Sequence, residues 1–280
     1  MVSDINYMRY KALSIAGFDG SGGAGIQADL KTFSALGCYG MTVLTALPIQ
    51  NTCGVRNCYT LPLQSIEDQL NALFDDIRPD SIKIGMLFNS EIIQLVASFL
   101  QKNAKNIPII IDPVTLAKSG DPLLLPEAID ALLNLLIPLA TLITPNIPEA
   151  ATFTGLTAQS EEEMLLVGQK LLEFGPKNVL LKGGHLNSIN SNDVLINSHD
   201  KPHWFASPRI STSNTHGTGC TLSAAITACL AQKIDLIDAC GIAKTYLFNA
   251  IQAAKDERVG LGNGPVQHFY HFWPVQLLDL

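Results

Sequence analysis

The feature that most constrains the fold is an alternation of short, β-branched-rich apolar runs with amphipathic segments of helical period. Such an alternation predicts βαβ units, and therefore a mostly parallel sheet flanked by helices, which is an α/β fold. We expect parallel strands at residues 11–17, 41–47, 81–84, 107–112, 141–144 and 178–182. We expect an antiparallel pair at residues 193–197 and 203–206.

The segments between these strands have the apolar spacing of helices. The predicted helices are residues 25–36, 65–77 with Ser65 as N-cap, 90–102, 146–153, 160–174, 218–232 and 235–258. No internal repeat, linker or block of charge interrupts the pattern. We therefore expect a single domain over residues 1–280, in which residues 1–10 form an N-terminal extension.

The composition narrows the class of protein. A hydrophobic fraction of 47% excludes a disordered chain, and the net charge of −7 argues against binding to nucleic acid or to a membrane surface. The six cysteines include no C-x-x-C spacing, so we expect neither a disulfide framework nor a zinc site, and we expect a cytoplasmic location. The longest apolar stretch, residues 123–145, is broken by prolines and acids, so no membrane span is expected.

Polar residues recur where the predicted strands end. Ligands of parallel α/β sheets bind in the crevice at the carboxyl ends of the strands. The strand-end residues are Asp19 with its glycine loop, Gln50, Met86, Asp112, Asn146 with Glu149, and Lys182. The sequence therefore predicts one site for a small molecule at this edge of the sheet.

Residues 20–25, GSGGAG, match G-x-G-x-x-G between a strand and a helix, the context of a dinucleotide-binding loop. That function also requires an acid about 20 residues further on to bind the ribose. No Asp or Glu lies between Asp29 and Glu67, so an NAD-dependent oxidoreductase is a remote alternative. Four glycines in six residues exceed what a tight turn needs, which favours close approach of the backbone to a ligand.

A second glycine loop, NTHGTGC at residues 214–220, precedes a helix of small residues. Gly217, Thr218 and Gly219 would present backbone N–H groups at the positive end of that helix, which suits a phosphoryl group. The chain contains no G-x-x-x-x-G-K-[ST], so it is not a P-loop enzyme.

Longer blocks carry a family resemblance: AGFDGSGGAGIQADLKTFSALGCYG, KIGML, LAKSGDPLL, LKGGH and NTHGTGCTLSAAI, in this order. From about residue 12 to residue 273 the chain resembles the hydroxymethylpyrimidine/phosphomethylpyrimidine kinases of thiamin biosynthesis, in the ribokinase-like branch shared with pyridoxal kinases. The resemblance implies a three-layer sandwich, ATP and Mg²⁺ as cofactors, and a homodimer. Gly20 stands where the family usually has Pro, and Thr115 where Met is common.

The same resemblance implies two phosphorylations, first of hydroxymethylpyrimidine and then of its monophosphate. It assigns Cys220 as acceptor of the hydroxyl proton and Gly217, Thr218 and Gly219 as an anion hole. A helix N-terminus lowers the pKa of a thiol, so a thiolate at Cys220 is chemically reasonable. The alternative for Cys220 is a small residue that packs the start of the helix.

For the nucleotide, the resemblance implies contacts from Lys182 and Asn146, with Asp112 and Glu149 at the magnesium. A carboxylate at the end of an apolar strand needs a cation partner, which is consistent with this role for Asp112. Asn146, Pro148 and Glu149 equally fit the capping box of a helix, and both roles can hold together.

For the pyrimidine, the resemblance points to the Ala24 backbone, Asp29, Gln50, Met86 and Val114. The amide of Gln50 can match the amino group and ring nitrogens of an aminopyrimidine. Met86 could instead be core packing, and Asp29 an exposed acid near a helix N-terminus. A pyridoxal or pyridoxine kinase and a pyrimidine-binding protein without catalysis remain as alternative functions.

Overall fold

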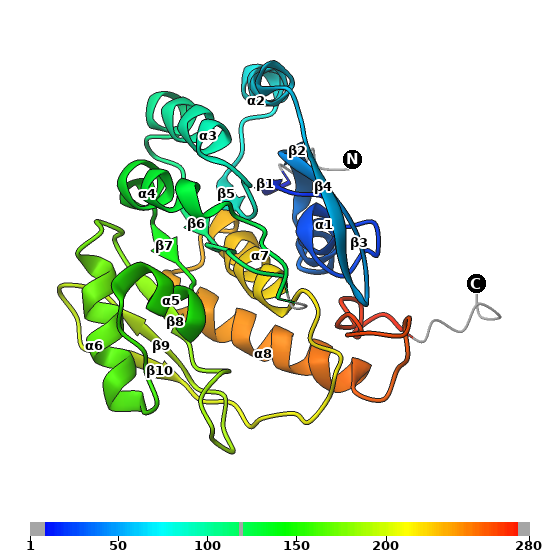
Figure 1. Cartoon of the computed structure of the whole chain (residues 1–280), viewed down its shortest axis with the longest axis vertical. Coiled ribbons are helices and arrows are strands. Elements are labelled where there is room, and N and C mark those ends of the chain that lie inside the picture. Colours follow the sequence, from blue (N-terminus) through cyan, green and yellow to red (C-terminus); the bar gives the residue numbers. More distant parts are fainter. Residues whose placement is uncertain (1–8, 118–119, 274–280) are drawn as a thin grey trace, which may run out of the picture.

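The computed structural model describes residues 9–117 and 120–273, so residues 1–8 of the expected extension lie outside the described residues (Figure 1). An eight-stranded sheet has the order β10-β9-β8-β7-β6-β5-β1-β2. Its strands are β1 (Lys11–Ala16), β2 (Tyr39–Leu44), β5 (Ser81–Ile84), β6 (Ile109–Ile111), β7 (Leu142–Ile143), β8 (Val179–Lys182), β9 (Asp193–Ile196) and β10 (His203–Phe205). Pairing is parallel from β2 to β8, whereas β9 and β10 run antiparallel to their neighbours. The predicted mostly parallel sheet is confirmed.

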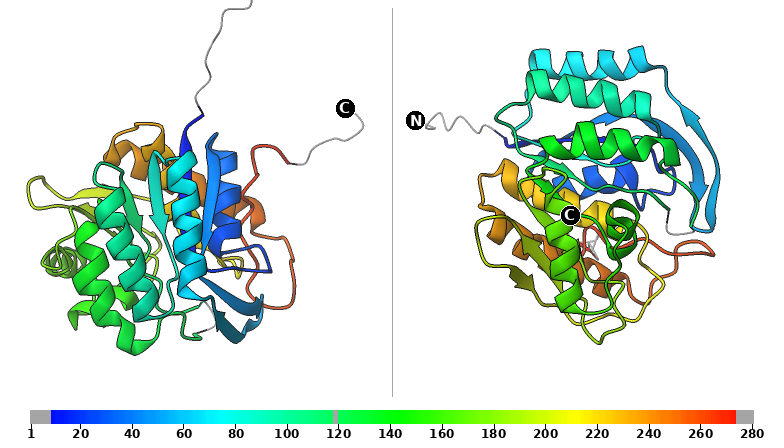
Figure 2. Two further views of the ribbon diagram at one scale, coloured as in Figure 1. Left: turned by 90° about the horizontal axis from the view of Figure 1, so that it is seen from above. Right: turned by 60° about the vertical axis from the view of Figure 1, so that its left-hand side comes forward.

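Helices cover both faces of this sheet (Figure 2). One layer holds α1 (Gly25–Ala35), α7 (Thr218–Ala231) and α8 (Leu236–Ala254). The other holds α2 (Leu63–Asp76), α3 (Ser90–Asn103), α5 (Ile147–Thr154) and α6 (Glu161–Leu172). Successive side chains of a buried strand point to opposite faces of the sheet and pack in the core on each side. Ile109 and Ile111 pack in the layer of α3 and α6, and Ile110 packs against α7 and α8.

The α7 helix is buried along most of its length because it lies between the sheet, α1 and α8. Its sequence TGCTLSAAITACLA is rich in small residues, which lets neighbouring elements pack closely against it. The burial fixes the direction of α7, whose first turn faces the carboxyl ends of β1, β5 and β6 (Figure 1). The same region of the fold was predicted to hold the site.

The predicted strand at residues 41–47 is wrong at its end. The chain leaves the main sheet after β2, and β3 (Ala46–Asn51) pairs with β4 (Gly54–Thr60) in a separate antiparallel hairpin. Only Thr45, a residue type common in strands, separates β2 from β3, so hydrophobic periodicity alone gave no boundary. Gln50 therefore belongs to the hairpin rather than to the edge of the main sheet.

Other boundaries also differ from prediction. Ser65 does not cap α2; Pro62 occupies the N-cap position, and the Ser65 hydroxyl donates to its carbonyl at 2.8 Å. The strand around residue 110 shortens to β6, since Pro108 has no N–H for the ladder. The apolar stretch after residue 123 contains unpredicted helical turns: Pro126–Ala128, α4 (Ile129–Ala131), Leu132–Leu136 and Ile137–Leu139.

Most remaining helix starts follow the sequence. Asn89 caps α3 by accepting from the N–H of Ile92, Ser160 caps α6, and Asp235 caps α8. Within the described residues, no helix is long and apolar enough to cross a membrane.

Candidate active site

A cavity of about 540 Å³ opens at the carboxyl ends of the parallel strands. Its size suits a small molecule. It gathers twelve of the thirteen predicted site residues from widely separated parts of the chain: Ala24, Gln50, Met86, Asp112, Val114, Asn146, Glu149, Lys182, Gly217, Thr218, Gly219 and Cys220. Asp29 is the exception among the described residues.

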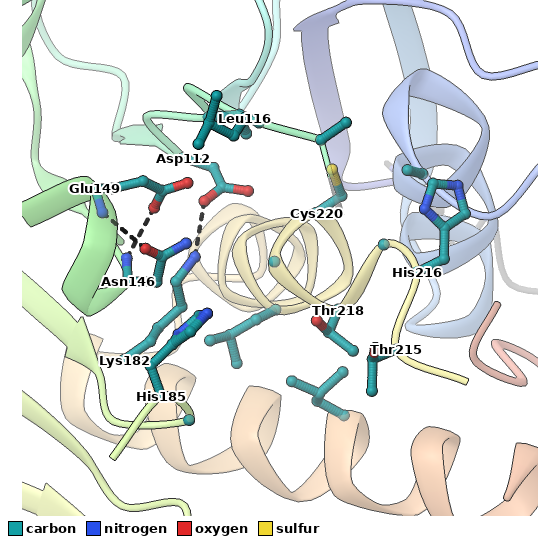
Figure 3. Close-up of a pocket in the computed structure, with 18 of the residues that line it drawn as sticks. Asp112, Leu116, Asn146, Glu149, Lys182, His185, Thr215, His216, Thr218 and Cys220 are labelled. Atoms are coloured by element: carbon teal, nitrogen blue, oxygen red, sulfur yellow. Dashed lines mark hydrogen bonds and ion pairs between the residues drawn. The ribbon is translucent and has the colours of Figure 1, made fainter. Parts of the chain in front are cut away.

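The start of α7 forms one end of the cavity, where two glycines permit close contacts. Gly217 has a φ of 77°, and a Cβ there would collide with the carbonyl oxygen of Gly23. A Cβ at Gly219 would lie 3.2 Å from Asp112 Oδ2 and 3.3 Å from Lys182 Nζ. Figure 3 shows both charged side chains beside the first turn of α7, with Cys220 on the other side of Asp112 from Lys182. The geometry brings N–H groups, a cation and a carboxylate together.

Asp112 is almost fully buried and only half satisfied. Its Oδ1 accepts from Lys182 Nζ at 3.0 Å and from Thr144 Oγ1 at 3.3 Å. Its Oδ2 is buried and has no hydrogen-bond donor in the described part of the chain. A buried carboxylate oxygen without a partner is costly, so this atom fits a bound cation. Mg²⁺ commonly binds through one or two carboxylates, water and substrate phosphates, and these residues fit that arrangement.

Lys182 remains charged in this setting. Burial works to lower its pKa, but the carboxylates of Asp112 and Glu149 outweigh burial and raise it. Lys182 projects from the last position of β8, so the strand fixes the ammonium next to Gly219. A fixed cation at this place can neutralise phosphate oxygens.

Asn146 and Glu149 form the predicted capping box of α5. Asn146 Oδ1 accepts from the N–H of Glu149 at 2.9 Å, and Glu149 Oε2 accepts from the N–H of Asn146 at 2.8 Å. Burial raises the pKa of Glu149 to about 7, although the Lys182 cation opposes the rise. The capping interpretation is confirmed, and both side chains also line the cavity.

Cys220 lies in the first turn of α7 and faces the cavity (Figure 3). Burial of the thiol raises its pKa to about 11, although the nearby Lys83 cation opposes the rise. The prediction of a low-pKa thiolate is therefore wrong, because desolvation outweighs the helix N-terminus at this position. At neutral pH the group is a thiol, which can donate a weak hydrogen bond to a ligand.

Asp29 lies outside the cavity wall, behind Lys83. Both side chains are fully buried, and Lys83 Nζ lies 2.8 and 3.0 Å from the two carboxylate oxygens. Ser14 Oγ donates to the same carboxylate at 2.5 Å. Burial alone would lower the pKa of Lys83, but the Asp29 carboxylate outweighs burial and raises it. The alternative that Asp29 is solvent-exposed is wrong.

Lys83 itself lines the cavity and was missed in the sequence. The signal was present, because a lysine inside an otherwise apolar strand needs a buried partner. Only the fold shows that the partner is Asp29, 54 residues away.

The first glycine loop is organised around Asp19, which is fully buried. Its carboxylate accepts from the N–H groups of Ser21, Gly23 and Ala24, from Ser21 Oγ, and from His216 Nε2 at 2.8 Å. Burial works to raise the pKa of Asp19, but the hydrogen bonds from His216 and Ser21 outweigh it and lower the pKa. The loop N–H groups are thus occupied by the protein's own carboxylate, which argues against a pyrophosphate there and against an NAD-dependent enzyme.

Close packing within the chain explains two of these glycines. A Cβ at Gly23 would lie 2.9 Å from Pro265 and would collide with His216, and one at Gly25 would collide with the carbonyl oxygen of Gly17. Packing within the chain therefore accounts for both glycines, and the close approach of a ligand to this loop stays a prediction. Gly25 does line the cavity, as does Ala24, whose N–H is already donated to Asp19 at 2.7 Å.

The cavity wall also contains an amide and two apolar side chains. Gln50 comes from β3, Met86 follows β5, and Val114 follows β6. A hydrogen bond stabilises the position of the hairpin near Gln50, because the N–H of Val55 donates to Asp121 Oδ2 at 3.0 Å. The two departures from the family pattern differ in position: Thr115 is buried in the cavity wall, whereas Gly20 is exposed and outside it.

Arg209 and His185 also line the cavity and had no predicted role. The Arg209 guanidinium donates to the carbonyls of Gly184 at 2.8 Å, Leu186 at 2.7 Å and Ser188 at 2.8 Å. Arg209 therefore stabilises the loop after β8, and this loop places His185 in the cavity wall. The LKGGH block marked this loop, but no spacing in the sequence links it to Arg209.

Comparison with known proteins places this geometry in a family. Residues 19–267 match the model of the phosphomethylpyrimidine kinase family. The chain belongs to that family. It is 49% identical over 267 residues to the hydroxymethylpyrimidine/phosphomethylpyrimidine kinase of Salmonella typhimurium, covering 95% of this chain and 99% of that protein. A thiamine biosynthesis bifunctional protein of Geobacter sulfurreducens is 46% identical and covers 94% of this chain, which spans 53% of that protein.

Solved structures of family relatives share the fold. A phosphomethylpyrimidine kinase from Clostridium difficile is 44% identical with a TM-score of 0.76, over 87% of this chain and 100% of that chain. A pyridoxal kinase from Staphylococcus aureus in complex with ADP is 34% identical with a TM-score of 0.85, over 94% of both chains. The predicted ribokinase-like three-layer sandwich is confirmed. As a member of this kinase family, the protein is an ATP-dependent kinase.

Proposed function

We propose that the protein transfers the γ-phosphoryl group of ATP to 4-amino-5-hydroxymethyl-2-methylpyrimidine and then to its monophosphate, in the synthesis of thiamin diphosphate. One observation carries the proposal. A single cavity is lined both by the first turn of α7 with its charged neighbours and by Gln50, Met86 and Val114. Relatives that are 49% identical and carry both kinase names support the choice of substrate.

At the acceptor end, the pyrimidine ring would lie between Met86 and Val114, with its polar edge on the Gln50 amide. A Gln amide both donates and accepts, as the amino group and ring nitrogens require. Met86 is 8% exposed and held by its backbone, since its carbonyl accepts from Thr45 Oγ1 at 2.6 Å. A wall that is already fixed lowers the entropic cost of orienting the acceptor.

At the phosphoryl end, we assign the anion hole to residues 217–219 at the positive end of α7, where the N–H of Thr218 also donates to the carbonyl of Thr215 at 3.4 Å. Lys182 supplies a fixed positive charge close to the same turn. Phosphoryl transfer spreads negative charge over three oxygens, so these groups stabilise the transition state more than the ground state.

Magnesium would be held by Asp112 through its unpartnered Oδ2, with Glu149 reaching it through water. The ion supplies neutralisation of phosphate charge when it is bound. Asn146 would contact the nucleotide in addition to capping α5, a role supported by its place in the cavity wall.

Cys220 would contact the acceptor hydroxyl. A thiol with a pKa of about 11 is neutral at physiological pH, so its first role is to orient the hydroxymethyl oxygen. The loose transition state of phosphoryl transfer needs little help from a base before the new bond forms. Because a neutral thiol cannot take up a second proton, the hydroxyl proton would leave to a phosphate oxygen or to water late in the step, once the new O–P bond has largely formed.

A pyridoxal kinase is the second candidate, because relatives with that name are 33–37% identical. The test is kcat/KM for the aminopyrimidine, its monophosphate, pyridoxal and pyridoxine, each with ATP and Mg²⁺. We expect both pyrimidines to be preferred, and the preference to shrink in Gln50→Ala. Turnover of pyridoxal alone would overturn the assignment.

The domain organisation, location and partners of the protein are further proposals. We propose that the whole chain acts as one domain, a view supported by the continuous sheet that extends from β2 to β10. We also propose a cytoplasmic homodimer that does not bind nucleic acid or membranes. Light scattering of the purified chain tests the dimer directly.

A further inference from the structure

The two glycine loops at the cavity are joined by one pair of side chains. His216 Nε2, from the loop before α7, lies 2.8 Å from Asp19 Oδ2, in the loop before α1, across a sequence separation of 197 residues. Asp19 is fully buried and the His216 side chain is 13% exposed. In Figure 3, His216 stands on the side of Cys220 away from Lys182; it also lines the cavity and directly precedes Gly217 of the proposed anion hole.

The backbone around this pair leaves little room for independent motion of the loops. Gly23 would collide with His216 if it carried a Cβ, and Gly217 would collide with Gly23. The N–H of His216 donates to the carbonyl of Gly264 at 3.0 Å. The adjacent Asn263 donates its N–H to the carbonyl of Thr52, at the tip of the hairpin that carries Gln50.

Three separate segments therefore meet at His216: the loop of residues 19–25, the loop of residues 214–219, and the hairpin through residues 263–264. The first carries Ala24 and Gly25 in the cavity wall, and the second carries the first turn of α7. Acceptor and phosphoryl must approach within about 3–3.5 Å in line, and a misplacement of about 1 Å can cost ~10²-fold in rate. The relative position of these loops thus controls the reaction geometry.

We propose that the Asp19–His216 pair is a positioning bridge. It holds the loop of residues 19–25, which carries Ala24 and Gly25 in the cavity wall, in a fixed position relative to the anion hole at residues 217–219. The inference rests on the proposed kinase function. Both residues act through the loops that they join, and neither is assigned a contact with the reacting atoms.

The two members of the bridge differ in what their loss would disturb. Asp19 also accepts three N–H groups and a hydroxyl of its own loop, so a change there would disturb both the loop and the bridge. A change at His216 alters none of the four donors of the Asp19 loop and removes the imidazole that contacts Asp19 and Ser21 from the other loop. His216 is therefore the residue to alter.

The test compares His216→Ala with His216→Gln, whose terminal amide can again donate to Asp19, and with His199→Ala on the exposed surface as control. We expect kcat of His216→Ala to fall about 10–100-fold while both KM values stay within about threefold, because alignment rather than binding is lost. We expect His216→Gln to recover most of kcat, and His199→Ala to match the wild type. Thermal unfolding of each variant separates this effect from a loss of folded protein.

Hydrogen–deuterium exchange supplies a readout independent of activity. Peptides covering residues 19–25 and 214–219 should exchange faster in His216→Ala and return toward wild-type rates in His216→Gln. Unchanged kcat in His216→Ala, or equal losses in the alanine and glutamine variants, would overturn the bridge. If the wild type phosphorylates no pyrimidine, the proposed function fails instead, and unchanged exchange in both loops would then refute the bridge by itself.

Discussion

Replacement of Asp29 by Asn separates a structural role from a substrate contact. The Asp29–Lys83 pair is fully buried, with Nζ–O distances of 2.8 and 3.0 Å, so Asp29→Asn leaves an ammonium without its counter-charge. Breaking such a pair typically costs about 3–5 kcal/mol. For a chain of this order of size, about 2–4 °C is lost per kcal/mol, which predicts a fall in Tm of roughly 6–20 °C.

The assay is urea unfolding of the wild type, Asp29→Asn, Lys83→Met and the double variant. The double variant should recover at least half of the stability lost in Asp29→Asn, since it leaves no uncompensated buried charge. Ser14→Ala, which removes only the neutral donor to the carboxylate, should cost about 1–3 kcal/mol. KM for the pyrimidine should stay within about threefold in folded Asp29→Asn, because Asp29 lies outside the cavity wall. Unchanged stability together with a large rise in KM would refute this reasoning.

Three further predictions concern the other charged or titrating groups. Alkylation of Cys220 by iodoacetamide, followed by mass spectrometry, should be slow near pH 7 and accelerate as the pH rises toward 11. The exposed Cys53 should be labelled first. Rapid labelling of Cys220 near pH 7 would contradict the raised pKa of its thiol. Glu149 has a folded pKa of about 7 against an ordinary 4.5, so its stabilising effect is full below 4.5 and is lost as the pH rises through 7. Glu149→Gln should therefore gain up to about 3 kcal/mol on the wild type between pH 5 and pH 8 in urea unfolding, and a constant difference would exclude the shift. Asp112→Asn should lower kcat by about 10²–10³-fold and weaken the dependence of rate on Mg²⁺ concentration, whereas an unchanged magnesium dependence would remove Asp112 from the metal site.

The sheet and its helices were predictable because their signals are local. Apolar runs of the right length marked all but one of the parallel strands closely, and caps such as Asn146 and Ser160 marked helix starts. The β3–β4 hairpin was missed because only Thr45, itself a good strand former, separates β2 from β3. The position of Gln50 on a hairpin, instead of on the sheet edge, follows from that omission.

Properties that depend on tertiary environment were not predictable. The pKa of Cys220 is decided by desolvation, which no local pattern reveals. Lys83 needs a buried partner because it lies in an apolar strand, but only the packing of α1 on the sheet shows that this partner is Asp29. Asp19 and His216 lie at opposite ends of the chain, so their contact likewise requires the complete fold.

We propose that this one cavity performs two successive phosphoryl transfers to an aminopyrimidine. The most direct test follows the pyrimidine by mass during a time course with ATP and Mg²⁺, in the wild type and in Gly219→Ala, whose added methyl would crowd Asp112 and Lys182. The account predicts that the monophosphate appears first and the diphosphate follows in the wild type, and that both steps slow together in Gly219→Ala. A variant that loses one step and keeps the other, or a wild type that forms neither product, would contradict it.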